Sequence, residues 1–453
     1  MIVRVVRGFA LALLLVLIGA CAAQPARDAR RDAGATRPFD LLHYDVRVEP
    51  DIATQTVRGE ATLRLRALQD GPTVATLDSD DLVIDAIQRG NDALHFAQSG
   101  KQLAITLPQA LRRGRTIDIR LRYHGAPQFD LQFAPERSQV YTIFSTSQWL
   151  PGIDSPGERA SIDLRVILPP GLAAIGNGEL VAHTTLGDGR EQFHWRQRRE
   201  IPGYVMGFAA GRFHELRTRD GNIGLRFLGE DYSDHELRRV FAETGDMLRY
   251  FARRAGVAYA DRSYAQALVA KTIGQELSGF ALLSDDYARR VLADPTATGL
   301  VAHEVAHQWW GNEVTCREWT HFWLNEGLAT FMAASWQEQR YGAQAYQRQV
   351  DAWRKRHAEL IAAGHDKPLV FPEWSKPSAD DRAVVYQKGA LALHELRIRL
   401  GDAAFWRGIA LYTKTYAGKS VETADFQTAM ERASGENLAA FFTDWAYGPA
   451  APR

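Results

Sequence analysis

The sequence predicts an α+β fold in two domains, an N-terminal antiparallel β domain followed by a mainly helical domain. Three observations carry this prediction. Apolar and polar residues alternate in short stretches between residues 39 and 216, which is typical of half-buried strands. From about Ser233 apolar residues recur at helical spacing, and helical patterns dominate from Thr298 to the end. The length of 453 residues also exceeds one ordinary domain.

The strands of the first domain are predicted from strict alternation of apolar and polar residues. Because successive strand residues point to opposite faces of a sheet, such alternation buries one face and leaves the other in water. Turn-forming segments such as "QDGP" and "LGDG" separate the strands. The clearest alternating stretches are "HYDVRVEP" (43–50), "ATLRLRAL" (61–68), "TIDIRLRY" (116–123) and "SIDLRVILPP" (161–170).

In the second domain the apolar period becomes helical. Ser233 and Glu236 can form a capping box at a helix start, and Leu237 and Phe241 then lie on one face. The stretch "IGQELSG" (273–279) is interpreted as an edge strand between two glycines. Apolar residues fill the stretch after Asp294-Pro295 up to Gly311, which predicts a buried helix.

The first residues indicate export and anchoring. Arg4 and Arg7 precede an apolar run from Phe9 to Ile18 that is too short to span a bilayer and fits a signal peptide over 1–20. The run ends in "LIGAC", which resembles the lipobox of bacterial lipoproteins, so we expect a lipid on Cys21 and a flexible tether over 21–38. An ordinary signal peptide with a chance cysteine is the alternative. Ala22 is not the aspartate that retains such proteins in the inner membrane, so we expect the outer membrane, facing the periplasm.

The balance of charges argues against a nucleic-acid-binding protein, and the cysteine content argues against a disulfide within the chain. With 54 basic and 54 acidic residues, no global field draws the chain to nucleic acid, so none is expected as a partner. The chain has two cysteines, and with Cys21 modified Cys316 has no partner for a disulfide.

The predicted buried helix contains the strongest chemical signal, "HEVAH" (303–307). Residues four apart lie on one face of a helix, so His303 and His307 can direct their rings at one metal ion, while Glu304 lies beside them as a base. A third ligand must come from elsewhere, and Glu326 is the candidate. The alternative is a pair of core histidines satisfied by hydrogen bonds, but so many polar groups in an apolar stretch favour zinc.

The stretches "HEVAHQWWGNEVT" (303–315) and "HFWLNEGLATF" (321–331) resemble the gluzincin family of zinc metallopeptidases, which includes aminopeptidase N and leukotriene hydrolase. "LLHYDVRVEPD", "WLPGIDSP", "NGEL" and "YQKG" follow the order of that family, and the similarity covers roughly residues 39–450, without the large C-terminal helical domain of longer members. The resemblance implies a saddle-like β domain over 39–216, a thermolysin-like catalytic domain over 217–453, and peptide substrates.

The resemblance also implies residue roles. His303, His307 and Glu326 correspond to the ligands of one zinc ion, and Glu304 corresponds to the general base. Tyr386 in "YQKG" corresponds to the tyrosine that donates a hydrogen bond to the oxyanion, although a lone tyrosine is more often a core residue.

Substrate recognition departs from the family pattern. The family strand reads G-x-M-E-N, and "IGQELSG" keeps Glu276 as the partner of the substrate amine, with Gly279 as the glycine that lets substrate run alongside. The asparagine is replaced by Leu277, and Thr142 stands where a second acidic or amide anchor is expected. An aminopeptidase is therefore the leading hypothesis. An endopeptidase, an epoxide-opening hydrolase of the same fold and a catalytically inactive binding scaffold are the competing hypotheses.

Overall fold

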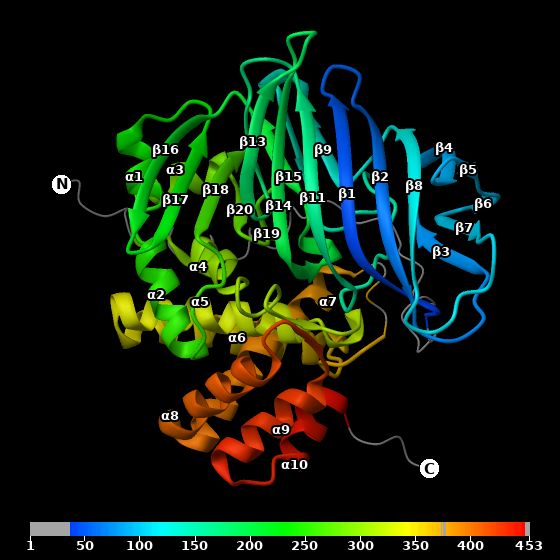
Figure 1. Ribbon diagram of the computed structural model, residues 1–453. Coiled ribbons are helices and arrows are strands. Elements are labelled where there is room, and N and C mark those ends of the chain that lie inside the picture. The colour runs from blue at the N-terminus through cyan, green and yellow to red at the C-terminus, as the bar shows by residue number, and fades with distance from the viewer. Residues whose placement is uncertain (1–36, 373, 375–376, 449–453) are drawn as a thin grey trace.

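The computed structural model describes residues 37–372, 374 and 377–448 (Figure 1). The predicted signal peptide (1–20), Cys21 and nearly all of the predicted tether (21–38) lie outside the described residues. The sheets occupy the upper part of the view in Figure 1, and helices α5, α6, α8 and α9 lie below them.

The first domain is built on an eight-stranded sheet. Its pairings are antiparallel except between β1 and β11, which run parallel with Val46 opposite Leu164. In the order of the sheet, the strands are β13 (Glu179–Thr185), β14 (Glu191–Pro202), β11 (Arg159–Leu168), β1 (Phe39–Asp51), β2 (Thr56–Ala67), β8 (Thr116–Gly125), β4 (Leu82–Arg89) and β5 (Asp92–Ala93).

Two smaller sheets complete this domain. One has three strands, β3 (Val74–Asp78), β7 (Gln102–Thr106) and β6 (Phe96–Ser99). The other has four strands, β12 (Ala173–Gly176), β15 (Phe208–Gly211), β10 (Gln139–Thr142) and β9 (Leu131–Ala134), with the short helical turns η3 (Pro135–Arg137) and η4 (Gly203–Val205) beside them.

The four alternating stretches form strands β1, β2, β8 and β11, as predicted. Tyr44, Val46 and Val48 of β1 are buried, while Asp45 and Arg47 between them are exposed. Each strand therefore buries one face in a common core, which confirms the interpretation of the alternation as half-buried strands.

The second domain contains a mixed five-stranded sheet in the order β16 (His214–Asp220), β17 (Ile223–Gly229), β18 (Ser263–Val269), β20 (Phe280–Ser284) and β19 (Gly274–Leu277). The predicted edge strand within "IGQELSG" is thus β19 at the end of the sheet. The predicted domain boundary after Leu216 falls inside β16, which pairs along its length with β17. By strand pairing, the change of sheet comes between β15 and β16.

The remaining elements are mainly helical, and the capping box of Ser233 and Glu236 is present at the start of the first helix. The helices are α1 (Asp234–Val240), α2 (Thr244–Ala255), α3 (Asp285–Ala293), α4 (Gly299–Ala306), α5 (Trp323–Tyr341), α6 (Ala343–Ala363), α7 (Ala379–Ala383), α8 (Gly389–Tyr416), α9 (Thr423–Ser434) and α10 (Ala439–Phe442). Shorter elements are β21 (Val314–Cys316), β22 (Lys419–Val421), the 3-10 turn η5 (Trp319–His321) and the π-helical turns η6 (Val384–Lys388) and η7 (Thr443–Tyr447).

The predicted buried helix is shorter than expected. α4 ends at Ala306, because the amides of Gln308 and Trp309 bond to carbonyls three residues back, at Val305 and Ala306. The chain then tightens into a turn, in which Gly311 has a φ of 135°. This early end places His307 at the C-terminal cap of α4 and not in its interior.

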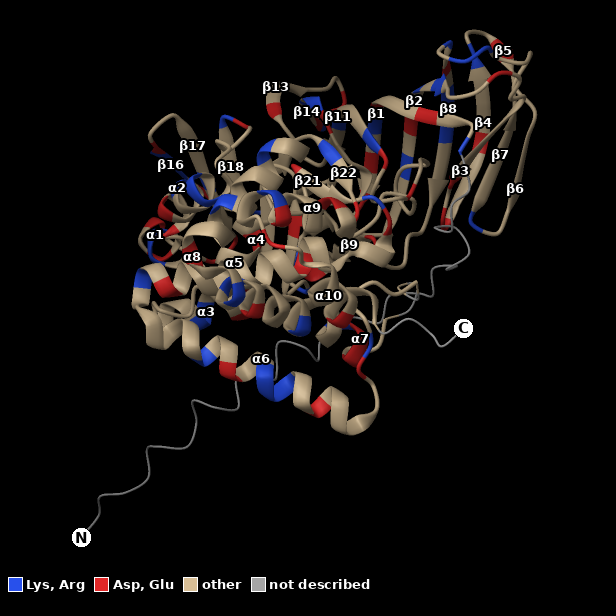
Figure 2. Cartoon of the chain, turned by 90° about the horizontal axis from the view of Figure 1, so that it is seen from below, with Lys and Arg blue, Asp and Glu red and all other residues tan. Residues whose placement is uncertain are grey.

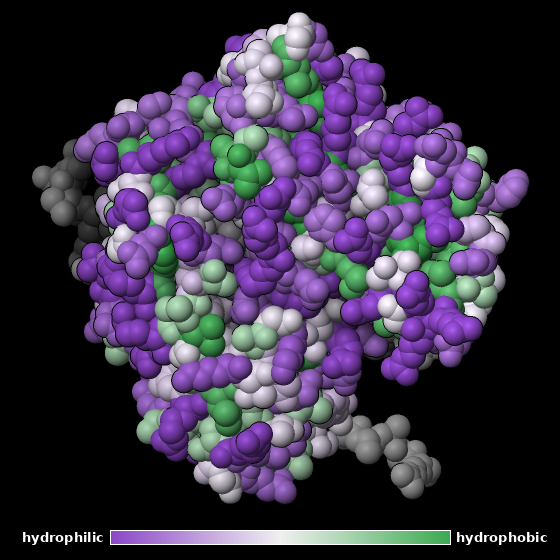
Figure 3. Space-filling model, viewed as in Figure 1, coloured by the Kyte–Doolittle hydropathy of each residue, from purple (hydrophilic) through white to green (hydrophobic). Residues whose placement is uncertain are grey.

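The surface carries charges of both signs. Figure 2 shows Lys and Arg interspersed with Asp and Glu along β1, β2 and β8 and along α6. The face in Figure 3 is mostly hydrophilic, with small and scattered apolar patches. The equal numbers of basic and acidic residues in the whole chain are therefore matched by charges of both signs along each of these elements.

Candidate metal and catalytic site

Three donor atoms from two helices meet at one point. His303 lies on α4, His307 caps it, and Glu326 lies in the first turn of α5. The Nε2 atoms of the two histidines are 3.0 Å apart, and Glu326 Oε2 is 3.1 Å from the first and 3.3 Å from the second. Zn–N bonds of ~2.0–2.1 Å in a tetrahedron set neighbouring donors about 3.3 Å apart. The triangle therefore fits zinc.

The orientation of the rings supports this fit. His307 Nδ1 lies 3.0 Å from the carbonyl oxygen of Trp310, so it donates there and leaves Nε2 with a lone pair toward the other donors. His303 Nδ1 lies 3.5 Å from the hydroxyl of Thr330. In this tautomer His307 directs Nε2 at the position that a metal ion would occupy.

The charges of the buried side chains also favour a bound metal cation. Burial by itself lowers the pKa of His307, but the carboxylates of Glu326, Glu276 and Glu304 outweigh it and raise this pKa to about 10. Burial by itself raises the pKa of Glu326, but His307 and His303 outweigh it and hold this pKa at about 2. Three buried carboxylates beside two imidazoles thus demand positive charge, which a dication supplies.

Glu304 lies beside the donor triangle with a free oxygen. It is 4% exposed, and its Oε2 has no hydrogen-bond partner within the described part of the chain. Burial raises its pKa well above the usual value. Its other oxygen lies against Gly274 of β19, where a Cβ atom would come within 2.4 Å of it. A carboxylate with a raised pKa and an unused oxygen suits proton transfer.

Glu276 lies close to Glu304 and His307. Its donor atom and those of Glu304 and His307 all lie within 4.8 Å of one another. Glu276 is 8% exposed, burial raises its pKa to about 7, and its Oε2 accepts a hydrogen bond of 2.7 Å from the side chain of Gln275. The residue predicted as the amine anchor thus lies close to the predicted base and to one predicted zinc ligand.

The two other positions of the predicted amine site have structural partners. The hydroxyl of buried Thr142 bonds to the backbone carbonyl and amide of Phe208, at 3.3 and 3.0 Å. Gly279 has a φ of 86° in the turn after β19, and its amide donates to Gln308 Oε1 at 3.0 Å. The role of Gly279 in substrate binding stays a prediction.

Comparisons with known proteins identify the family. Residues 41–205 match the peptidase M1 N-terminal domain, and residues 277–445 match the peptidase family M1 domain. The chain belongs to peptidase family M1. The zinc fit of the donor triangle agrees with this membership, because members of the family hold one catalytic zinc ion.

Relatives cover most of this M1 chain. It is 26% identical to leukotriene A-4 hydrolase of Xenopus laevis over 86% of its own length and 67% of that protein. It is 22% identical to mitochondrial aminopeptidase 2 of Saccharomyces cerevisiae over 89% of its length and 46% of that protein, so it spans about half the length of that enzyme. An M1 zinc metallopeptidase mutant from Deinococcus radiodurans, bound to a Tyr-Ser-Ala substrate, superposes with a TM-score of 0.78 and 26% identity, covering 92% of this chain and 96% of that one.

The predicted oxyanion tyrosine of this M1 chain contacts the metal site. Tyr386 lies in the π-helical turn η6, and its ring stacks on that of His303, with the centroids 5.9 Å apart and the planes at 13°. Tyr386 is partly exposed.

The packing that positions this turn was not predicted from the sequence. A Cβ atom on Gly327, the residue after Glu326, would lie 3.1 Å from the Cα of Gly389 and 3.2 Å from the carbonyl oxygen of Val385. The two glycines let α5 and the start of α8 pack backbone to backbone, which brings Tyr386 beside the donors. The available signal was the glycine that ends each motif, in "NEG" and in "YQKG".

Proposed function

We propose that this chain is a zinc-dependent aminopeptidase, which removes residues from the N-termini of peptides. The closeness of Glu276 to Glu304 and His307, with donor atoms within 4.8 Å, carries the proposal. A carboxylate in this place pairs with the α-ammonium group of a substrate, and the first peptide bond then lies next to the donors His303, His307 and Glu326. The aminopeptidases among the relatives support the same activity.

The residues of the pocket account for the steps of hydrolysis. Zinc, when bound, lowers the pKa of a water molecule to ~7 and polarises the substrate carbonyl. Glu304 takes the proton of the attacking water on its free oxygen and later donates it to the leaving amine. Tyr386 donates its hydroxyl proton in a hydrogen bond to the carbonyl oxygen as that oxygen becomes negative.

The proposal is tested with one peptide in two forms, with a free or an acetylated N-terminus. The wild-type protein should cleave the free form faster and release its first residue. Glu276→Ala should remove most of this preference and keep the zinc, because the charge-assisted contact of roughly 1.5–3 kcal/mol is lost. Equal rates on both forms, with cleavage inside the chain, would replace the aminopeptidase by an endopeptidase.

The position of Thr142 makes an endopeptidase the second candidate function. Thr142 offers no charge where a second amine anchor is expected, and its hydroxyl is already used by Phe208. The preference for free N-termini should accordingly be smaller than two acidic anchors would produce.

The cellular location is part of the proposal. The segment 1–20 and Cys21 support lipid anchoring in a bacterial outer membrane, with the enzyme facing the periplasm. Among the described residues, none of the helices has the length and apolar character needed to cross a bilayer. Cys21→Ser should move the processed protein from the membrane fraction to the soluble periplasm, and a processed variant that stays in the membrane fraction would contradict lipid anchoring.

A further inference from the structure

Gln275 stands between the two domains and contacts the proposed amine anchor. It is 2% exposed, and its side-chain amide group is used at both ends. Its Nε2 donates to Glu276 Oε2 at 2.7 Å and to the backbone carbonyl of Glu276 at 3.0 Å. Its Oε1 accepts a hydrogen bond of 3.3 Å from the backbone amide of Phe144, which belongs to the first domain.

The segment that leads into β19 is docked on the first domain by further hydrogen bonds. The amide of Ala270 donates to Gln139 Oε1 at 3.0 Å, and the amide of Lys271 donates to the hydroxyl of Tyr141 at 3.2 Å. The Nζ of Lys271 donates to the carbonyl of Phe133 at 2.9 Å. Strands β9 and β10 of the first domain therefore set the place from which β19 starts.

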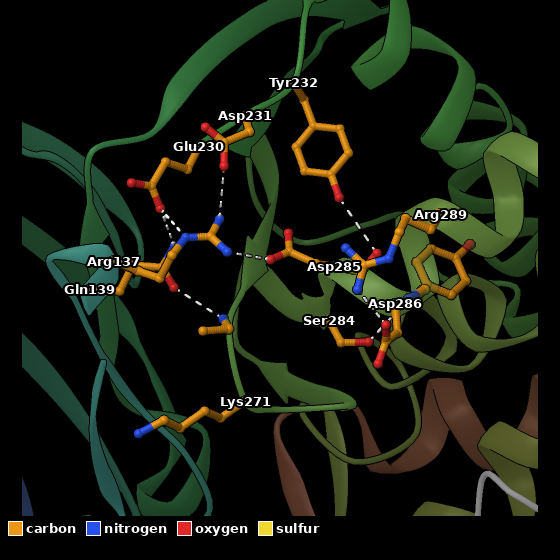
Figure 4. A network of polar contacts seen from close by, with 12 residues as sticks. Arg137, Gln139, Glu230, Asp231, Tyr232, Lys271, Ser284, Asp285, Asp286 and Arg289 are labelled. Carbon is orange, nitrogen blue, oxygen red and sulfur yellow. Dashed lines mark hydrogen bonds and ion pairs between the residues drawn. The ribbon is translucent and has the colours of Figure 1, made fainter. Parts of the chain in front are cut away.

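An ion-pair cluster next to this docking fixes the same interface, as Figure 4 shows. Arg137, just before β10, lies 2.5 Å from Glu230 and 3.0 Å from Asp285, both in the second domain. Because Asp285 is buried and Arg137 and Glu230 are partly buried, these pairs are screened less than fully exposed pairs.

The Phe144 end of the connection is held in a rare conformation. Phe144 has a φ of 53°, in the left-handed region that non-glycine residues seldom adopt. Asp130 holds both of its neighbours, since its carbonyl accepts from the amide of Ile143 at 2.8 Å and its carboxylate accepts from the hydroxyl of Ser145 at 2.5 Å. The amide that bonds to Gln275 therefore has a fixed direction.

We propose that Gln275 is a positioning residue, which aligns the carboxylate of Glu276 with the first domain so that its second oxygen accepts the substrate's α-ammonium group. This inference rests on the proposed aminopeptidase function. The bond to Oε2 fixes the rotation of the carboxylate, and the bond from Phe144 fixes Gln275 in turn. An apolar residue at position 275 would leave the Phe144 amide without this acceptor and Glu276 free to rotate.

Gln275→Met tests the inference, because methionine has a similar volume and lacks the amide group. We expect KM for a free peptide to rise about tenfold, since one hydrogen bond to a charged group is lost, while kcat stays within about threefold. The rate on the N-acetylated peptide and the zinc content should not change. Gln347→Met on the exposed face of α6 is the matched control and should match wild type in all four measurements.

Gln275→Asn provides a second test that keeps a polar side chain in case the methionine variant does not fold. Its shorter side chain cannot span Phe144 and Glu276 together, so KM should rise in the same direction. An unchanged KM for the free peptide in either folded variant, or an equal loss on both forms of the peptide, would overturn the role of Gln275. A wild-type protein without preference for free N-termini would instead overturn the proposed function.

Discussion

Gly274→Ala should inactivate the enzyme by displacing its base. Gly274 starts β19, and a Cβ atom there would lie 2.4 Å from Glu304 Oε1, whereas ordinary contact begins at 3.4 Å. The carboxylate must therefore retreat by about 1 Å, because the backbone of β19 is held by its pairing with β20. A retreat of this size moves Glu304 away from the water that it has to deprotonate.

The size of the effect follows from this displacement. A misplacement of about 1 Å in a catalytic geometry can reduce the rate by about 100-fold, which corresponds to about 2.7 kcal/mol of transition-state stabilisation. Stability should change little, because the group that has to move is the end of a flexible side chain and because alanine also restricts the unfolded chain. The loss should therefore appear in kcat and not in the melting temperature.

The assay combines kcat on a free peptide with zinc content and thermal unfolding. Gly187→Ala in the turn before β14 is the matched control, since a Cβ atom there meets nothing within 4 Å. We expect the Gly274 variant to keep one zinc per chain and lose about 100-fold in kcat, while the control keeps full activity. A Gly274→Ala enzyme with wild-type kcat would refute the assignment of Glu304 as the base in this position.

Three further predictions concern the pocket and the β domain. Glu304→Gln should keep zinc and lose at least ~100-fold in kcat, whereas His307→Ala should lose the metal, both checked by metal analysis and peptide hydrolysis. Tyr386→Phe should lower kcat by about 100-fold with little change in KM, because one oxyanion donor is worth roughly 3 kcal/mol, and unchanged kcat would exclude this role. Burial raises the pKa of Glu158 to about 7, so its contribution to stability is present below its usual pKa of 4.5 and is lost as the pH rises through 7. Glu158→Gln should therefore raise the free energy of unfolding at pH 8 by about 2 kcal/mol relative to wild type and by little at pH 5, as denaturant titration would show.

The strands and the two histidine donors could be predicted because both depend on local spacing. Alternation in "HYDVRVEP" reports which face of β1 is buried, and the four-residue interval from His303 to His307 reports one face of α4. The parallel pairing of β1 with β11 could not be predicted, because the same alternation is compatible with either direction and with any neighbour. The predicted boundary after Leu216 fell inside β16 for the same reason, since a strand of either sheet shows the same pattern.

The contacts of the site that were missed are those between residues far apart in the sequence. Glycine at 274, 327 and 389 has no side chain to show a pattern, yet each position lets another group approach within contact distance. Gln275 stands where the related family has methionine, and only the position of Phe144, from the other domain, gives its amide group a partner.

The contribution of each domain to the site follows from the elements that carry the zinc donors and the proposed amine anchor. All three proposed zinc donors come from α4 and α5, so the second domain alone can hold the metal. The proposed amine anchor comes from β19, which pairs with β20 in the second domain. The segment just before β19 bonds to Gln139 and Tyr141 of β10, and Gln275 in β19 bonds to Phe144. Trp319, just before the zinc helix α5, packs against the cores of both domains. The proposed amine anchor is therefore held by contacts from both domains, whereas the metal donors are held by the second domain. Under the proposed function, selection for the first residue of a peptide would thus depend on contacts from both domains, whereas the metal donors come from the second domain alone.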